Sequence, residues 1–176
     1  MLNENGSNPA FKGQFANQGV IRVKDDWTNN VDNGAFSSEI GSVELFGYYQ
    51  RIRGIKYTQF HNLSTLGYGT KEMFIDTKVD VLLDINDNEL ATRKYNLHVN
   101  TPVALAIVRD NGFISSRHLG FLTRDMNVQA EYLFPVGVYK MYRPVKMTPS
   151  NTALSTFSMR MVPKDPSVAN FSRSTK

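Results

Sequence analysis

The stretch MFIDTKVDVLLDINDNE, residues 73–89, is the strongest structural signal in the chain. Its odd positions up to Ile85 are apolar apart from Thr77, while most of its even positions are charged. Alternation with a period of two is typical of a β-strand that buries one face and leaves the other in water. The segment therefore predicts a long half-buried strand, followed by a polar turn built by Asp87 and Asn88.

The acidic end of this stretch has part of the residue pattern of a calcium-binding loop. Asp84, Asn86 and Asn88 fit the first, third and fifth positions of an EF-hand loop. The sixth position needs glycine and the twelfth needs a bidentate glutamate, but these positions hold Glu89 and Tyr95. We therefore expect a turn rather than a metal site, and no metal is expected elsewhere.

The same alternation recurs from residue 19 to residue 163 and predicts an all-β domain. Gly54, where the alternation changes phase, indicates a β-bulge. Asn111-Gly112 after the apolar run Val103–Val108 is typical of a hairpin. About eight strands at regular spacing predict an antiparallel β-sandwich.

The two ends of the chain differ from this domain. Residues 1–18 are rich in polar residues and glycine and predict an extended N-terminal arm, with Phe11 and Phe15 as assembly anchors. Residues 164–176 predict a C-terminal tail with Phe171 as its anchor.

Composition and motifs point away from catalysis. The chain of 176 residues has no cysteine, and its three histidines form no metal-binding spacing. No nucleophile elbow or phosphate-binding loop is present, so we expect neither enzymatic activity nor a cofactor. The longest apolar run, Val103–Val108, is far shorter than the roughly 20 residues of a membrane helix. We expect no transmembrane segment and no secretory signal.

Positive charge is concentrated late in the chain. Residues 135–176 contain seven Lys/Arg and one Asp/Glu, whereas residues 1–50 contain three and six. Such an asymmetry suits an acidic partner, of which nucleic acid is the commonest. The candidate nucleic-acid contacts are Arg51, Arg53, Lys56, Tyr57, Lys140, Arg143 and Lys146. The alternative is a mixed, solvated surface.

One segment also supports a resemblance. PVALAIVRDNGFI, residues 102–114, is similar to a central strand of the small single jelly-roll coat proteins of viruses. The resemblance implies a jelly-roll-like sandwich that oligomerises around symmetry axes. The first 21 residues contain a single lysine, unlike the basic arms of many such coats.

Three functions follow from these expectations. The first is a structural subunit of a virus or phage particle, assembling with itself and other virion proteins, located in the virion and soluble in the host cytoplasm before assembly. The second is a viral matrix or nucleic-acid-binding accessory protein. The third is a module that binds carbohydrate or peptide. Its surface aromatic candidates are Trp27, Tyr48, Tyr49, Tyr68 and Tyr95.

Overall fold

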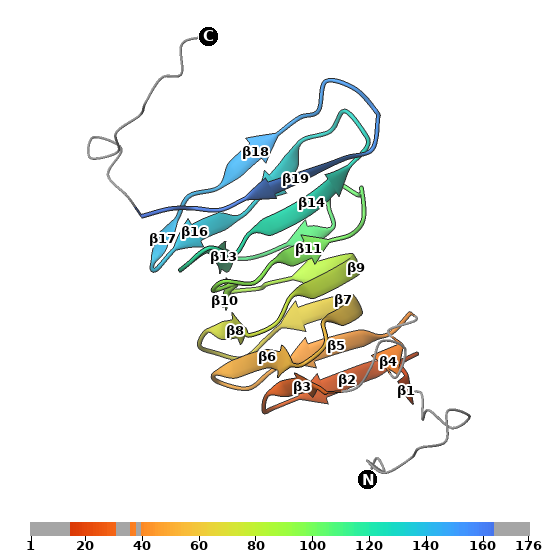
Figure 1. Ribbon diagram of the computed structural model, residues 1–176, viewed down its shortest axis with the longest axis vertical. Coiled ribbons are helices and arrows are strands. Elements are labelled where there is room, and N and C mark those ends of the chain that lie inside the picture. The colour runs from red at the N-terminus through yellow and green to blue at the C-terminus, as the bar shows by residue number, and fades with distance from the viewer. Residues whose placement is uncertain (1–14, 31–35, 38–39, 164–176) are drawn as a thin grey trace.

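The computed structural model describes residues 15–30, 36–37 and 40–163, and the regular structure in these ranges consists of β-strands (Figure 1). Within these ranges no helix is long and apolar enough to cross a membrane. Two of the predicted assembly anchors, Phe11 and Phe171, lie outside the described residues.

Most strands belong to two large sheets. The eight-stranded sheet contains, in spatial order, β19 (Ser155–Met159), β14 (Leu122–Met126), β11 (Leu97–Val99), β9 (Thr77–Asp84), β7 (Thr58–Thr65), β5 (Ser42–Leu45) and β2 (Val20–Val23), with β12 (Ile107–Val108) also on β9. The seven-stranded sheet contains β17 (Met141–Tyr142), β16 (Val136–Val138), β13 (Phe113–Ser115), β10 (Glu89–Ala91), β8 (Lys71–Met73), β6 (Gln50–Gly54) and β3 (Trp27–Asn29). Two small sheets pair β1 (Phe15–Ala16) with β4 (Phe36–Ser37) and β15 (Tyr132–Phe134) with β18 (Val145–Met147).

The chain alternates between the two large sheets and so winds into a β-solenoid of about five turns. Most strands pair in parallel with the strand one turn later, as Thr58 pairs with Thr77 and Thr77 with Leu97, steps of 19 and 20 residues. Figure 1 shows the turns stacked along the long axis of the molecule, from β2 and β3 to β16 and β17.

The predicted antiparallel jelly-roll sandwich is therefore wrong. Alternating burial usually marks antiparallel sheets, because parallel sheets are normally covered on both faces. Here two parallel sheets pack face to face and leave their outer faces in water, which gives the same alternation. The corner after β9 and the corner at Asn111-Gly112 lead from one sheet into the other and are not hairpins.

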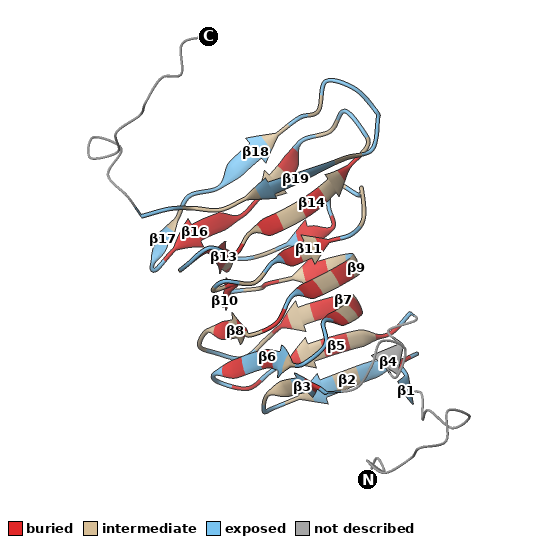
Figure 2. Cartoon of the chain, in the orientation of Figure 1, coloured by how far each residue is buried: buried red, intermediate tan, exposed pale blue. Residues whose placement is uncertain are grey.

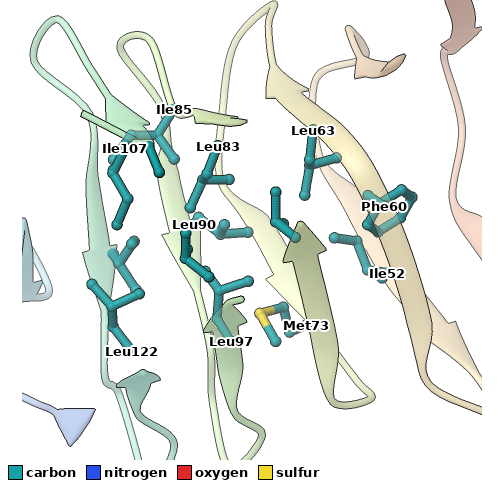
Figure 3. Close-up of a cluster of buried hydrophobic side chains, with 14 of the residues drawn as sticks. Ile52, Phe60, Leu63, Met73, Leu83, Ile85, Leu90, Leu97, Ile107 and Leu122 are labelled. Carbon is teal, nitrogen blue, oxygen red and sulfur yellow. The ribbon is translucent and has the colours of Figure 1, made fainter. Parts of the chain in front are cut away.

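The core consists of columns of equivalent apolar residues (Figure 3). Val43 pairs with Leu63 and Leu63 with Leu83, and Leu83 in turn pairs with Ile107. All four side chains are buried. Because successive turns lie about 4.8 Å apart, each side chain in such a column packs on the one below it.

The long strand predicted over residues 73–85 is interrupted. Met73 ends β8 in one sheet, and β9 begins only at Thr77 in the other. The pairing between β7 and β9 also shifts register, because Phe60 pairs with Val79 but Asn62 pairs with Leu82. Val81 lies in the shifted part of β9 and is 45% exposed. The β3–β6 pairing keeps its register through Gly54, which pairs with Asn29, so the bulge expected at Gly54 is not found there.

Buried polar side chains bond the backbone at the corners between the sheets. Gln50 donates from Nε2 to the carbonyl oxygens of Val23 (2.9 Å) and Asp25 (2.6 Å). Asn88 donates to the carbonyl of Thr65 at 2.9 Å. Lys71 has no exposed surface and lies directly opposite Gln50 in the ladder. These side chains supply donors that corners cannot obtain from a strand neighbour.

Lys71 is bonded by backbone carbonyls alone among the described residues. Its Nζ donates to the carbonyl oxygens of Gly47 (2.5 Å), Tyr48 (3.3 Å) and Tyr68 (3.2 Å). Burial lowers the pKa of Lys71 to about 8, because desolvation disfavours the charged amine. The side chain therefore ties two successive corners together.

The C-terminal end of the solenoid is closed by strands that reverse direction. β19 pairs antiparallel with β14, and β17 pairs antiparallel with β16. Beneath them Arg124 is fully buried and donates to the carbonyls of Leu133 (2.7 Å), Val103 (3.0 Å) and Ala104 (3.0 Å). In Figure 2 the closing strands β18 and β19 are largely exposed, whereas the strands below them are largely buried.

Gly54 provides a test of the corner geometry. Its φ is +143°, and a Cβ there would lie 1.9 Å from the carbonyl oxygen of Asn29. We expect Gly54→Ala to lower the free energy of unfolding by about 2 kcal/mol. Gly19→Ala is the matched control, because a Cβ at Gly19 meets nothing within 4 Å. Urea denaturation of both variants measures the difference, and equal midpoints would contradict this geometry.

Candidate binding groove on the eight-stranded sheet

The outer face of the eight-stranded sheet carries polar side chains in rows that cross the strands. In one row Lys78 pairs with His98, His98 with Thr123, and Thr123 with Ser158. A second row runs beside it from the residue before β9 to the residue after β19. Its members are Asp76, Asn96, Phe121 and Arg160, and each contacts the next.

A groove of about 450 Å³ lies on this face. Its lining residues come from four neighbouring strands and the segments just before them: Asp76, Thr77, Lys78, Asn96, His98, Phe121, Thr123 and Ser158. Because the row partners are fixed by strand register, the groove crosses β9, β11, β14 and β19 rather than following any one of them.

Hydrogen bonds hold the walls of the groove. His98 Nε2 lies 3.1 Å from Asp125 Oδ1, and the hydroxyls of Thr123 and Ser158 are 2.8 Å apart. The Asp125 carboxylate also accepts from Thr156 Oγ1 at 2.7 Å. These contacts fix the side-chain rotamers of His98, Thr123 and Ser158.

The other row is held by the backbone. Asp76 Oδ1 accepts from the backbone N–H of Asn96 at 2.8 Å, and Asn96 Oδ1 accepts from the N–H of Phe121 at 3.2 Å. The guanidinium carbon of Arg160 lies 4.8 Å from the centre of the Phe121 ring. One side of the ring is thus in contact with Arg160.

Several groups in the groove keep hydrogen-bonding capacity. Within the described residues the structure gives Lys78 Nζ no ion pair, and the ammonium lies 5.3 Å from the Tyr57 ring centre. Asp76 Oδ2 and Asn96 Nδ2 likewise have no hydrogen bond within the same part of the chain. The groove therefore offers donors and acceptors together, without an excess of either charge.

The opposite face of the solenoid has a different chemistry. On the seven-stranded sheet Arg117 makes two bonds to Glu89, 2.9 Å from Nε and 2.6 Å from Nη2, and this contact raises the pKa of Arg117. Arg93 Nη1 lies 3.3 Å from Glu72 and its guanidinium lies 4.6 Å from the Phe74 ring centre. Both carboxylates are engaged by arginine, so they form a structural network rather than an acid and base pair.

The stretch Asp84–Glu89 forms a corner. Asn86 has φ of 42°, and the Asn88 N–H donates to the carbonyl of Ile85 at 2.9 Å. Asp87 Oδ1 accepts from the backbone N–H (3.1 Å) and the side-chain amide (2.7 Å) of Asn111 in the next turn of the solenoid. These polar residues therefore bond neighbouring corners, as short polar side chains do in turns. Within the described residues, no group of three or more acidic or histidine side chains could hold a metal.

The predicted nucleic-acid contacts lie in two groups. Arg51, Arg53, Lys56 and Tyr57 belong to β6 and the corner after it, whereas Lys140, Arg143 and Lys146 lie at the C-terminal end. Strands β6 and β16 are separated by three other strands, which is roughly 19 Å at the usual spacing. Within the described residues Arg53 forms an ion pair with Asp26 (3.2 Å) and Lys146 forms one with Glu131 (2.7 Å).

The aromatic candidates are also divided. Tyr48, Tyr49 and Tyr68 are largely exposed at the corners beside β6 and β8, whereas Trp27 is half-buried, with its Nε1 3.1 Å from Thr58 Oγ1. Tyr95 packs against the core. Phe15 in β1 is 58% exposed and so remains accessible as an anchor.

Sequence reasoning did not find the groove. None of the residues that line the groove is among the candidate site residues predicted from the sequence. Neighbouring residues of the first row are 20, 25 and 35 positions apart in the sequence, so only the correct strand pairing brings them together.

Comparisons with protein-family models, curated proteins and solved structures found no match for this chain.

Proposed function

We propose that the chain is a non-enzymatic structural subunit of a virus or phage particle, and that it joins a second copy of itself through the N-terminal end of its solenoid. The supporting observation is the difference between the two ends. At the N-terminal end β2 and β3 are the outermost strands of their sheets, and no described strand pairs with the outer edge of β2. Such an edge pairs readily with another chain.

The interior is also less covered at this end. Ile21, Val23 and Trp27 pack against the core but are only partly buried, and Val20 is 61% exposed. At the C-terminal end, by contrast, the core side chains of β15 have no exposed surface. Association at the N-terminal end would therefore cover apolar surface, which favours a stable contact.

A second copy is the occupant that suits this edge. Two identical edges related by a two-fold axis can pair antiparallel, β2 with β2 and β3 with β3, which gives a closed dimer. The other end of the solenoid runs in the reverse direction through β17 and β19. The outer strands at the two ends therefore run in opposite directions, and β2 or β3 of a second copy could not continue the parallel ladder head to tail.

The virus or phage particle comes from the expectation, based on the sequence, of a subunit that assembles with itself. The solenoid fold changes which component of the particle we propose. Stacked turns extend a molecule along one axis. A spike or vertex component suits that shape better than a curved shell subunit. Other virion proteins are the further partners in this proposal.

The backbone of β2 allows a sharp test. The carbonyls of Gly19 and Val23 accept from β5, so by the alternation of a strand the N–H of Val20 points away from β5, toward the free edge. Val20→Pro removes this edge donor without breaking the β2–β5 ladder. We expect the dimer dissociation constant to rise on the order of tenfold or more, because two-fold pairing loses the bond twice.

Size-exclusion chromatography with light scattering across a concentration series measures this effect. Val20→Ala is the matched control, because it shortens the same side chain and keeps the N–H. A wild-type chain that stays monomeric at every concentration, or a dimer that both variants leave unchanged, would contradict the proposal.

A further inference from the structure

We infer that the groove on the eight-stranded sheet binds a neutral linear saccharide, laid across β9, β11, β14 and β19. This site is separate from the proposed self-association, which uses the edges of β2 and β3. The inference stands on the geometry of the groove, the chemistry of its lining and the balance of its charges.

The geometry suits an extended chain of repeating units. The two rows of side chains that border the groove advance by one strand at each step, about 4.8 Å. This step is close to the length that one sugar unit adds to an extended glycan. Lys78, His98 and Thr123 therefore present one polar group for each successive unit. Three strand spacings separate Lys78 from Ser158, so two or three units fill the groove.

The hydrogen-bonding groups suit hydroxyls, which both donate and accept. The Lys78 ammonium and the Asn96 amide are donors, whereas the free oxygen of Asp76 is an acceptor. The imidazole of His98 keeps Nδ1 available, since Nε2 contacts Asp125. A ligand with only acceptors, such as a phosphate, would leave Asp76 without a donor and would approach two carboxylates.

The apolar part of the lining suits the carbon faces of sugar rings. Phe121 is half-buried. Its backbone is bonded by Asn96 and its ring contacts Arg160, so its orientation is fixed before a ligand arrives. The electron-rich face of an aromatic ring attracts the weakly positive C–H groups of a pyranose. Pre-ordered side chains also reduce the entropy lost on binding.

The charges of the site favour a neutral ligand over an acidic one. Asp76 and Lys78 offset each other within the groove, and Asp125 lies behind His98. Arg93 and Arg117 lie on the opposite, seven-stranded sheet, where Glu72 and Glu89 engage them, and the Arg160 guanidinium beside the groove contacts the Phe121 ring.

The test uses the full chain and saturation-transfer NMR. The neutral probes are tetrasaccharides of β-1,4-glucose, α-1,4-glucose and β-1,4-N-acetylglucosamine, and the acidic comparator is tetragalacturonate. We expect at least one neutral probe to bind and the acidic comparator to bind more weakly. Lys78→Ala and Phe121→Leu should each weaken the binding on the order of tenfold.

Lys24→Ala is the matched control, because Lys24 is an exposed lysine beyond β2, far along the sheet from the groove. It should leave the affinity unchanged. Absence of binding to every neutral probe, tighter binding of the acidic probe, or equal affinities for Lys78→Ala and Lys24→Ala would overturn the inference. The monomeric Val20→Pro variant should bind as the wild type does, so failure of self-association and failure of the groove are distinguishable.

Discussion

Arg124→Met is expected to lower the free energy of unfolding by about 3–5 kcal/mol, because three buried carbonyls each lose a donor at a cost of roughly 1–3 kcal/mol. The guanidinium bonds three backbone carbonyls, from Leu133, Val103 and Ala104, and it lies 5.1 Å from the ring centre of Tyr132. Methionine fills much of the volume but leaves the carbonyls without donors. Burial also lowers the pKa of Arg124 to about 10.

The effect should be concentrated at the C-terminal end. Hydrogen exchange should become faster in β14, β15 and the loop of residues 102–106, while β5 and β7 should change little. Arg143→Met is the control, because the Arg143 guanidinium is exposed and bonds only the carbonyl of its neighbour Tyr142 within the described chain. If the free energy of unfolding fell by less than about 0.5 kcal/mol in both variants, Arg124 would not be what stabilises this end.

Lys71→Met is expected to cost about 3 kcal/mol at pH 7, close to one kcal/mol for each carbonyl that loses its donor. The Nζ of Lys71 bonds the carbonyls of Gly47, Tyr48 and Tyr68 in two successive corners. Urea denaturation measures the loss. Lys24→Met, at an exposed site, should change stability by less than about 0.5 kcal/mol.

The loss should also depend on pH. The pKa of Lys71 is about 8 in the folded chain and 10.5 as the ordinary value, so between these values the unfolded chain holds the proton and the folded chain does not. Stability from this group therefore rises as pH increases from 8 to 10.5, and it is lost as pH falls through 8. The gap between wild type and Lys71→Met should widen over this window. A gap that narrows would contradict the direction of the pKa shift.

The strands themselves could be inferred from the sequence, but their partners could not. The alternation from Thr77 to Leu83 identifies a strand with one wet face whichever way its neighbours run. The choice between parallel and antiparallel pairing depends on contacts about 20 residues away. Leu63, Leu83 and Ile107 share one column, yet the steps between them are 20 and 24 residues. Such uneven steps leave no repeat visible in the sequence.

The corners could be predicted as turns but not as links between sheets. Asp87 and Asn111-Gly112 have the composition of turns in either fold. In the solenoid Asp87 bonds Asn111 of the next corner, a contact that only the parallel stack provides. Lys71 and Arg124 could not be predicted as buried, because a charged residue in a polar segment is normally exposed.

The late position of the closing strands has a consequence for synthesis. Each turn of the solenoid contacts mainly its neighbours, so the first turns can form while the ribosome is still translating the later ones. Strands β17 and β19 follow all the parallel strands in the chain. Until they emerge, the newest turn presents an open edge and uncovered apolar columns to the solvent. A pause in translation between the codons for residues 115 and 155 would prolong this exposure and increase aggregation of the nascent chain.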